Sequence, residues 1–312
     1  MTFKLRIGSR PSRLALAQTE LVRARLGELI PGLAAEIVQI RTSGDRITSP
    51  SLAQVGGKGL FIRELEQALA DRQIDLAVHS LKDLPAVLAP EFRLAAVSPR
   101  EDARDVLVAG DATDLASLRK GARLGTSSLR RRFLALKANP GLQIVPLRGN
   151  VDTRLQRLAE GAMDAIIIAM AGLKRLGRGD VKCTPLDDRE FIPTGGQAAL
   201  ALETLALPPA ELERALVAFN DSQARYETTA ERSFLATIGA SCSTPVGVKA
   251  TVNSDSVVLR SILFAEDGSS ELSDEIEEPL DVDLAPSSAE SLGIRLGERM
   301  LARGADRLIA HE

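Results

Sequence analysis

The chain is 312 residues long, 45% hydrophobic and 26% charged, which suits a soluble globular protein of about two domains at roughly 150 residues each. Its longest apolar run, residues 165–173, is far shorter than the roughly 20 residues that span a bilayer, and the first residues lack the apolar segment of a signal peptide. We therefore expect a cytoplasmic protein without a membrane partner. With no tryptophan and only 3% aromatic residues, the sequence also disfavours nucleic-acid binding by base stacking.

The charge is spread unevenly along the chain. Of the 39 basic and 42 acidic side chains, 4 basic and 13 acidic ones fall in residues 261–312, so that segment has a net charge of −9 and residues 1–260 one of +6. The overall net charge of −3 therefore hides a basic body. We interpret the acidic stretch at residues 266–283 as a solvated face of a small terminal domain.

Strand-like and helix-like segments alternate from the N-terminus, which predicts an α/β architecture with largely parallel sheets. The apolar pattern predicts, in order, a strand over residues 3–7, a helix over 11–27, a strand over 34–41, a helix over 60–70 and a strand over 75–79.

A second region repeats this order of motifs. Residues 125–131, GTSSLRR, resemble residues 8–14, GSRPSRL, in ending one strand and opening one helix. Residues 164–175 likewise resemble residues 75–83, because each begins with an acidic residue, continues as an apolar strand and has a basic residue at the C-terminal end of that strand. Two similar α/β domains would face one another, with crossings near 99–104 and 191–196. Ligands of open α/β sheets bind beyond the carboxyl ends of the strands, where these motifs fall.

The last part of the chain predicts a third, smaller domain. A helix over residues 221–238, a loop of small residues around Cys242, strands within 248–265 and a helix over 289–302 follow one another. The expected division is domain 1 at residues 1–98 and 199–216, domain 2 at 104–192, and domain 3 at 221–312.

Of the six arginines in residues 121–154, five gather around two predicted strand ends. The first strand leads through Gly125, Thr126, Ser127 and Ser128 into a helix that opens on arginines. Unpaired helix N–H groups, hydroxyl side chains and the positive end of the helix dipole make such a turn an anion site. The arginines are Arg130, Arg131, Arg132, Arg148 and Arg154.

Several other residues allow both a structural and a functional interpretation. Asp83, at a strand end, suits a helix cap or a surface ion pair, or a carboxylate that stabilises a cationic intermediate. His79 suits a core histidine better than a general base. Lys58, in a glycine-rich segment without a P-loop pattern, suits a surface loop or a lid. Cys242 suits a buried small residue, although its small neighbours would let a bulky group approach the sulfur, and Cys183 has no such setting.

Together the motifs resemble the porphobilinogen deaminase family over essentially the whole chain. The matching segments are RIGSRPSRLAL, VGGKGLFIRELE, DLAVHSLKDLP, GTSSLRRR, LRGNVDTRL, DAIIIAMAGLKRLG, GGQAALALE and SCSTPVG, in the family's order and spacing. The resemblance implies two periplasmic-binding-protein-like (type II) α/β domains and a small α+β C-terminal domain that carries the cofactor cysteine.

The activity that the resemblance implies is a transferase of tetrapyrrole (haem) biosynthesis. Four porphobilinogen molecules are deaminated and condensed head to tail into hydroxymethylbilane, with release of ammonia, on a covalent dipyrromethane primer. The partners are porphobilinogen and the growing pyrrole chain, and the family is usually monomeric. The alternative from another class is a non-catalytic anion-binding receptor of periplasmic type.

The resemblance also implies roles for individual residues, carried by position in the motifs. Asp83 is the catalytic residue, and Cys242 holds the cofactor through a thioether. The cofactor is also contacted by Lys82, Asp83, Thr126, Ser128, Arg130 and Arg131. Substrate is contacted by Arg10, Ser12, Arg148, Arg154, Arg175 and Gln197, and the lid carries Lys58 and Phe61. No metal is implied.

The chain departs from the family pattern at two places. Ala240 and Ser241 precede the cofactor cysteine where many members have two glycines, and Ala198 stands where many have the second glycine of Gly-Gln-Gly. If those glycines adopt positive φ, the loop geometry here must differ, which affects Gln197 most.

Overall fold

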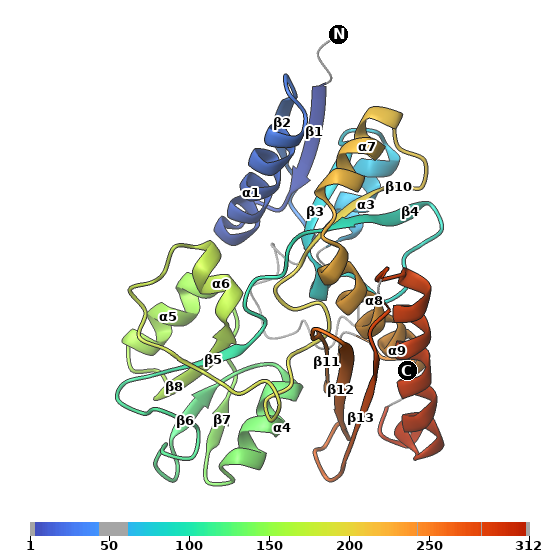
Figure 1. The fold of residues 1–312 in the computed structure, drawn as a ribbon. Helices are drawn as coiled ribbons and strands as arrows, with labels where there is room; N and C mark the ends of the chain where they lie inside the picture. Colours follow the sequence, from blue (N-terminus) through green and yellow to red (C-terminus); the bar gives the residue numbers. More distant parts are fainter. Residues whose placement is uncertain (1–3, 44–61, 242, 282, 310–312) are drawn as a thin grey trace. The chain divides into compact units, whose positions relative to one another are not determined.

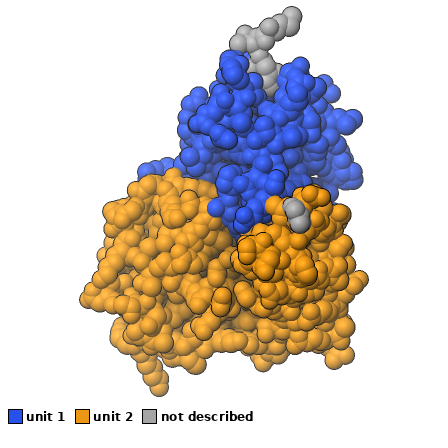
Figure 2. Space-filling model, in the orientation of Figure 1, with its two compact units in different colours: residues 1–100, 199–225 blue, residues 101–198, 226–312 orange. Residues whose placement is uncertain are grey.

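The computed structural model describes residues 4–43, 62–241, 243–281 and 283–309 (Figure 1). The chain forms two compact units, residues 1–100 with 199–225 and residues 101–198 with 226–312, coloured blue and orange in Figure 2. Among the described helices, none combines the length and the apolar character that crossing a bilayer requires.

The first unit is built on a five-stranded mixed sheet in the order β2-β1-β3-β10-β4. β1 runs parallel to β2 and β3, whereas β10 runs antiparallel to β3 and β4. The strands are β1 (Lys4–Ser9), β2 (Ala34–Gln39), β3 (Leu76–Ser80), β4 (Phe92–Val97) and β10 (Leu200–Leu205).

Helices cover both faces of this sheet, so its central strands are apolar on both sides. In β3, Leu76 and Val78 point to one face and pack with apolar residues of α1 and α7, whereas Ala77 points to the other face and packs with α3. Ser12 begins α1 by accepting a hydrogen bond from the N–H of Ala15. The helices are α1 (Arg13–Leu29), α3 (Arg63–Ala70), α7 (Ala210–Phe219) and the short 3-10 helix η2 (Leu81–Asp83).

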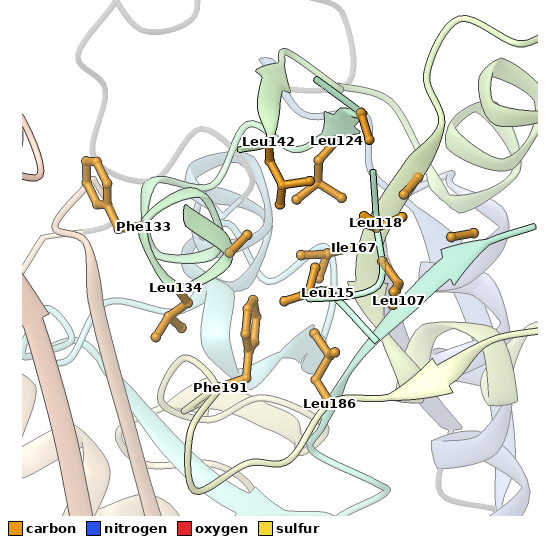
Figure 3. Packing of buried hydrophobic residues seen from close by; sticks show 14 of the residues in the cluster. Leu107, Leu115, Leu118, Leu124, Phe133, Leu134, Leu142, Ile167, Leu186 and Phe191 are labelled. Carbon is orange, nitrogen blue, oxygen red and sulfur yellow. The ribbon is translucent and has the colours of Figure 1, made fainter. Parts of the chain in front are cut away.

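The second unit contains a sheet of the same pattern, in the order β7-β6-β8-β5-β9. β6 runs parallel to β7 and β8, and β5 runs antiparallel to β8 and β9. Figure 3 shows the core on one face of this sheet, a single buried cluster that includes Leu107 and Ile167 of the strands and Phe133 and Leu134 of α4. The elements are β5 (Asp105–Ala109), β6 (Arg123–Gly125), β7 (Gln143–Val145), β8 (Ala165–Ala169), β9 (Thr184–Pro185), α4 (Leu129–Ala138), α5 (Val151–Ala159) and α6 (Met170–Arg175).

A three-stranded antiparallel sheet, in the order β11-β12-β13, also belongs to the second unit. Its core joins Phe234 of α8, Leu259 of β12 and Leu296 of α9. It also contacts helix α4 of the neighbouring α/β domain, because the ring centroids of Phe133 and Phe264 lie 5.5 Å apart. The elements are α8 (Ser222–Thr237), β11 (Val246–Val252), β12 (Ser256–Phe264), β13 (Glu271–Pro279), α9 (Pro286–Ala302) and the 3-10 helix η3 (Ala305–Arg307).

The expected fold class is confirmed: two mixed α/β sheets and a C-terminal antiparallel domain. The three domain ranges stay a prediction, since the structure has two compact units. The expectation of largely parallel sheets is wrong at one strand of each sheet. β10 and β5 are the first strands after each crossing, and they start opposite the carboxyl ends of β3 and β8, at Leu200 opposite Ser80 and Asp105 opposite Ala169. A strand that enters its sheet from the carboxyl edge must run antiparallel to its parallel neighbours.

The acidic stretch near the C-terminus forms the edge strand β13 as well as turns. The side chains of β13 alternate between exposed and half-buried positions, and four of its five acidic side chains pair with basic ones. The charged pairs are Lys137–Glu271, Arg260–Glu275, Arg295–Glu278 and Arg299–Asp274. A charged edge strand of this kind resists pairing with other chains, in keeping with the predicted solvated face.

Candidate functional site

In the first unit, the predicted residues lie just beyond the carboxyl ends of β1 and β3. A small pocket at this edge is lined by Arg10, Gln18, His79, Ser80 and Asp83, among others. The pocket therefore brings Arg10 and Asp83 together, as the sequence predicted for strand ends.

Asp83 is the exposed last residue of η2, directly after β3. Across the described part of the chain, no side chain or backbone group forms a hydrogen bond or an ion pair with its carboxylate. Neither structural interpretation of Asp83, a helix cap or a surface ion pair, is therefore seen among these residues. A carboxylate on the wall of a pocket is placed to meet a cation or an N–H donor of a ligand.

Ser12 is used differently from Asp83. Its hydroxyl oxygen caps α1 by accepting a hydrogen bond from the N–H of Ala15 at 3.2 Å. The structure thus shows a helix-capping role for Ser12, and its predicted contact with substrate remains untested.

His79 lines the same pocket but is held from behind by a buried acid. Its Nε2 lies 2.9 Å from Oε2 of Glu203 on β10, and both side chains are buried. Burial, and then the charge of Glu203, raise the pKa of Glu66 on α3 above its ordinary value. The expected core histidine is therefore a buried histidine with a carboxylate partner.

In the second unit, the predicted anion-binding turn follows β6. The Oγ1 of Thr126 accepts a hydrogen bond from the N–H of Ser128 at 3.2 Å, and the Oγ of Ser128 accepts one from the N–H of Arg131 at 3.4 Å. Ser127 fixes the neighbouring strand end by accepting a hydrogen bond from the N–H of Leu147 at 3.1 Å. Accepting these bonds leaves the hydroxyl protons of Thr126 and Ser128 for a ligand acceptor.

The arginines that open α4 are buried around a carboxylate that the sequence analysis did not single out. Nη2 of Arg130 donates to Oδ2 of Asp105 at 2.7 Å, and Nη2 of Arg131 donates to Oδ1 at 2.7 Å. The other Nη of Arg130 donates to the carbonyl of Ile192 at 2.7 Å, and that of Arg131 to the carbonyl of Ile167 at 3.1 Å. We call these three side chains, Asp105, Arg130 and Arg131, the arginine centre.

In the arginine centre, the carboxyl group of Asp105 stays ionised although it is buried. Burial alone would raise the pKa of Asp105, but the charges of Arg131 and Arg130 and their hydrogen bonds bring it well below its ordinary value. Burial lowers the pKa of Arg130, against the attraction of Asp105. Nε of Arg131 is buried and has no hydrogen-bond partner among the described residues. The arginine centre therefore holds two cations, one anion and an unused donor.

Arg154 and Arg175 add positive charge to the same unit. Burial, and then repulsion by Arg131, lower the pKa of Arg154 to about 10, which leaves it charged at neutral pH. Burial lowers the pKa of Arg175 to about 10, and its Nη2 donates to the carbonyl of Ala198. Arg148 is half-buried in the segment after β7. The structure thus brings Arg154 near the arginine centre and ties Arg175 to the crossing.

Gln197 is fully buried at the crossing. Its Nε2 donates to Oδ1 of Asp105 at 3.0 Å and to the carbonyl of Ala103 at 2.7 Å. The preceding residue is fixed as well, since the N–H of Gly196 donates to the buried carboxylate of Glu231 at 2.7 Å. The structure therefore shows Gln197 supporting the arginine centre, and its predicted contact with substrate remains untested.

The two departures from the family pattern have different outcomes. Ala198 adopts φ 74°, so this chain keeps a left-handed backbone at that position without glycine, contrary to the expected change in geometry. Its methyl group packs with Ala103 and Ala171. Ala240 and Ser241 do not adopt positive φ, so nothing at these two positions requires glycine.

Three predicted residues lie outside the described residues: Cys242, Lys58 and Phe61. The cysteine's neighbours are described, and the N–H of Ser241 donates to Oγ1 of Thr244 at 2.9 Å in an exposed turn.

Asp105 and Glu203 are the residues that sequence reasoning missed. Asp105 opens the apolar strand DVLVA directly after the crossing, and Glu203 stands in the apolar strand LALETL. A single acid within a strand that is otherwise apolar predicts a buried charge, and a buried charge needs a partner. That signal was available in both strands.

Two family models together match most of the chain. Residues 5–209 match a model described as "Porphobilinogen deaminase, dipyromethane cofactor binding domain", and residues 225–302 match "Porphobilinogen deaminase, C-terminal domain".

Curated relatives cover nearly the whole chain. A porphobilinogen deaminase of Syntrophotalea carbinolica is 44% identical over 306 residues, which are 98% of this chain and 95% of the relative. One of Chromobacterium violaceum is 43% identical over 98% of this chain and 97% of its own length. One of Roseiflexus sp. is 47% identical over 84% of this chain and 86% of its own length.

Solved structures of periplasmic binding proteins match more distantly. The aliphatic sulphonate binding protein SsuA of Escherichia coli is 17% identical, with a TM-score of 0.41 over 99% of this chain and 92% of that chain. The fold class therefore rests on the sheet topology of this chain itself.

Proposed function

Since the chain belongs to the porphobilinogen deaminase family, we propose that its arginines bind pyrrole carboxylates, that Asp83 carries the chemistry and that Cys242 anchors the primer. The protein is a transferase of tetrapyrrole biosynthesis that acts on porphobilinogen, and it contains a dipyrromethane cofactor-binding domain. This activity replaces the alternative of a non-catalytic anion receptor.

The observation that carries the proposal is the local excess of positive charge at the arginine centre and the neighbouring Arg154. Arg130 and Arg131 share one buried carboxylate, Arg154 is repelled by Arg131, and Nε of Arg131 is a buried donor without a partner among the described residues. Buried polar groups in proteins almost always have partners, and buried charges are paired. A ligand carboxylate would supply both the missing acceptor and the missing negative charge.

The same observation fits the dipyrromethane cofactor, whose pyrrole rings carry acetate and propionate groups. We assign its carboxylates to Arg130 and Arg131, with hydroxyl donors from Thr126 and Ser128. Lys82 and Asp83 of the first unit are assigned to it by motif position, and Cys242 by its place in SCSTPVG. When bound, the cofactor supplies the pyrrole α-carbon from which the chain grows.

Substrate and the lengthening chain are assigned to the remaining residues of the motifs. Each porphobilinogen unit adds carboxylates, and guanidinium groups bind carboxylates in bidentate fashion and stay charged. The assigned residues are Arg10, Ser12, Arg148, Arg154, Arg175 and Gln197, with Lys58 and Phe61 on the lid.

The chemistry is assigned to the carboxylate of Asp83. Loss of ammonia from porphobilinogen leaves a cationic, electrophilic carbon, and a fixed carboxylate stabilises positive charge that develops nearby. Its support is its position on the pocket wall, where no described residue occupies the carboxylate. A carboxylate already held in a hydrogen bond or an ion pair would have to give up that interaction before it bound the ligand.

Intact-protein mass spectrometry tests the proposal directly. The purified protein from a haem-making host should be heavier than its sequence by two pyrrole units, and Cys242→Ser should abolish the excess. Cys183→Ser is the matched control and should keep it. An unmodified wild-type protein, or an excess retained in Cys242→Ser, would overturn the anchor. A cytoplasmic location and a monomeric state belong to the same proposal, and cell fractionation and light scattering test them.

A further inference from the structure

The buried carboxylate of Asp105 has no part in the roles assigned so far. It opens β5, is 0% exposed and already accepts hydrogen bonds on both carboxylate oxygens. All of its recorded partners are side chains of the same unit: Arg130, Arg131 and Gln197. Its contacts therefore act on ligands only through these side chains.

Asp105 fixes the planes of both guanidinium groups. Each arginine donates one Nη to Asp105 and the other Nη to a backbone carbonyl, of Ile192 for Arg130 and of Ile167 for Arg131. Two anchors at the end of a planar fork leave it no freedom to rotate. Gln197 in turn holds the carboxylate through Oδ1 at 3.0 Å. The unpartnered Nε of Arg131 is thus held in one place before a ligand arrives.

Asp105 also sets the charge that a ligand meets. Two buried guanidinium groups side by side repel each other, and Arg154 adds a third cation repelled by Arg131. One ionised carboxylate offsets part of this charge and leaves the rest. With the pKa of Asp105 lowered by its two arginines, it stays ionised across the neutral range.

We propose that Asp105 is a positioning residue for pyrrole carboxylates: it fixes Arg130 and Arg131 in place before binding and cancels one of their two charges, so that a ligand carboxylate completes the balance. The inference rests on the proposed function, because it deepens the role given there to the two arginines. Asp105 acts on the ligand through the two arginines and does not touch it.

The test replaces Asp105 by Asn in the full-length protein. Asparagine keeps the shape but accepts from only one arginine and presents an NH2 group to the other. Residues that orient a binding group from behind typically change affinity 10- to 100-fold, so we expect the KM for porphobilinogen to rise by roughly that factor. The fraction of protein carrying dipyrromethane should fall in intact-mass spectra, and kcat of the loaded fraction should change by less than about three-fold.

Asp164→Asn is the matched control. Asp164 precedes β8 of the same sheet and also holds two arginines, at 3.4 Å from Arg119 and 2.7 Å from the N–H of Arg123, but at the opposite end of the strand. Its removal should leave KM and cofactor loading unchanged. A purely structural Asp105 would lower stability while its folded, loaded fraction kept a normal KM, and that result would overturn the proposal.

A second comparison remains informative if Asp105→Asn does not fold. Arg130→Gln alone and Arg130→Gln with Asp105→Asn differ only in whether Arg131 keeps its carboxylate. We expect the double variant to have a KM about ten-fold above the single one, and equal values would overturn the proposal.

Two further variants separate this inference from the proposed function. If Arg131→Gln and Arg154→Gln raise KM while Asp105→Asn does not, only the positioning role fails. If these arginine variants also leave KM and loading unchanged, the assignment of carboxylate binding to the arginines fails, and the positioning role fails with it.

Discussion

The two α/β sheets share one topology but place opposite charges at the same edge. In the first unit, β3 leads into η2, which ends on the exposed carboxylate of Asp83. In the second unit, β8 leads into α6, which ends on Arg175, a guanidinium whose pKa burial lowers to about 10. A repeated scaffold therefore presents a carboxylate in one unit and a guanidinium in the other, through a few residues after equivalent strands, and the proposed function gives them a chemical and a binding role respectively.

Buried carboxylates differ between the units in the same way. Glu203 lies beside a single side chain of opposite character, His79, whose Nε2 is 2.9 Å from its Oε2. Asp105 lies against two arginines, which leaves positive charge unmatched. A buried acid in the antiparallel strand thus has one near partner in the first unit and two guanidinium groups in the second, where one positive charge exceeds the negative charge.

Asp83→Ala should have the largest effect, a loss of turnover. An active variant would contradict the proposed difference in role between Asp83 and Arg175. Removing a group that stabilises developing charge costs about 100- to 1000-fold in kcat. We expect that loss with the dipyrromethane mass excess retained, measured by product formation and intact mass. Asp71→Ala, which removes an exposed carboxylate at the end of α3, is the control and should keep full activity. Turnover of Asp83→Ala within three-fold of wild type would contradict the chemical role.

His79→Gln should have the next largest effect, a decrease in the free energy of unfolding. Removing the histidine leaves the buried Glu203 without its near partner, which costs about 1–3 kcal/mol, and more for a charged group. Chemical denaturation measures the loss in free energy of unfolding. Adding Glu203→Gln should recover part of it, since the uncompensated charge disappears. A His79→Gln variant as stable as wild type would show that Glu203 does not depend on His79.

Arg154→Gln should weaken binding by a smaller amount. A hydrogen bond to a charged group is worth about 1.5–3 kcal/mol, so the KM for porphobilinogen should rise at least roughly ten-fold with a smaller change in kcat. Arg157→Gln, which changes an exposed arginine of the same helix α5, is the control. Steady-state kinetics decide between them, and equal KM values for the two variants would remove Arg154 from the binding set.

Ala198→Gly should have the smallest effect. It tests whether the left-handed backbone at this position of the crossing is more stable with glycine than with alanine. A left-handed alanine costs about 1–2 kcal/mol, but glycine would lose chain entropy and the methyl contacts with Ala103 and Ala171, so the terms nearly cancel. We expect a change in unfolding free energy below about 1 kcal/mol. Ala199→Gly, buried at ordinary φ, should destabilise more, and the reverse order in thermal melts would contradict the argument.

Local patterns predicted the elements because they depend on near neighbours in the chain. The helix expected over residues 11–27 is α1, Arg13–Leu29, and the strand expected over 75–79 is β3, Leu76–Ser80. The serine cap of α4 follows from the motif for the same reason. The direction of β10 and β5 could not be read from such patterns, because it depends on which edge of the sheet each crossing enters.

The sequence by itself determined the family, the repeated strand-end motifs and the placing of Asp83 and the arginines at carboxyl edges, because motif order and strand ends are properties of the chain. Only the tertiary structure decided which charges meet. Asp105 is 25 residues from Arg130 in the chain and 92 from Gln197, yet all three join in one buried group. Burial in a low dielectric strengthens each of these hydrogen bonds and ion pairs. That burial arises from packing between segments that are far apart in the chain.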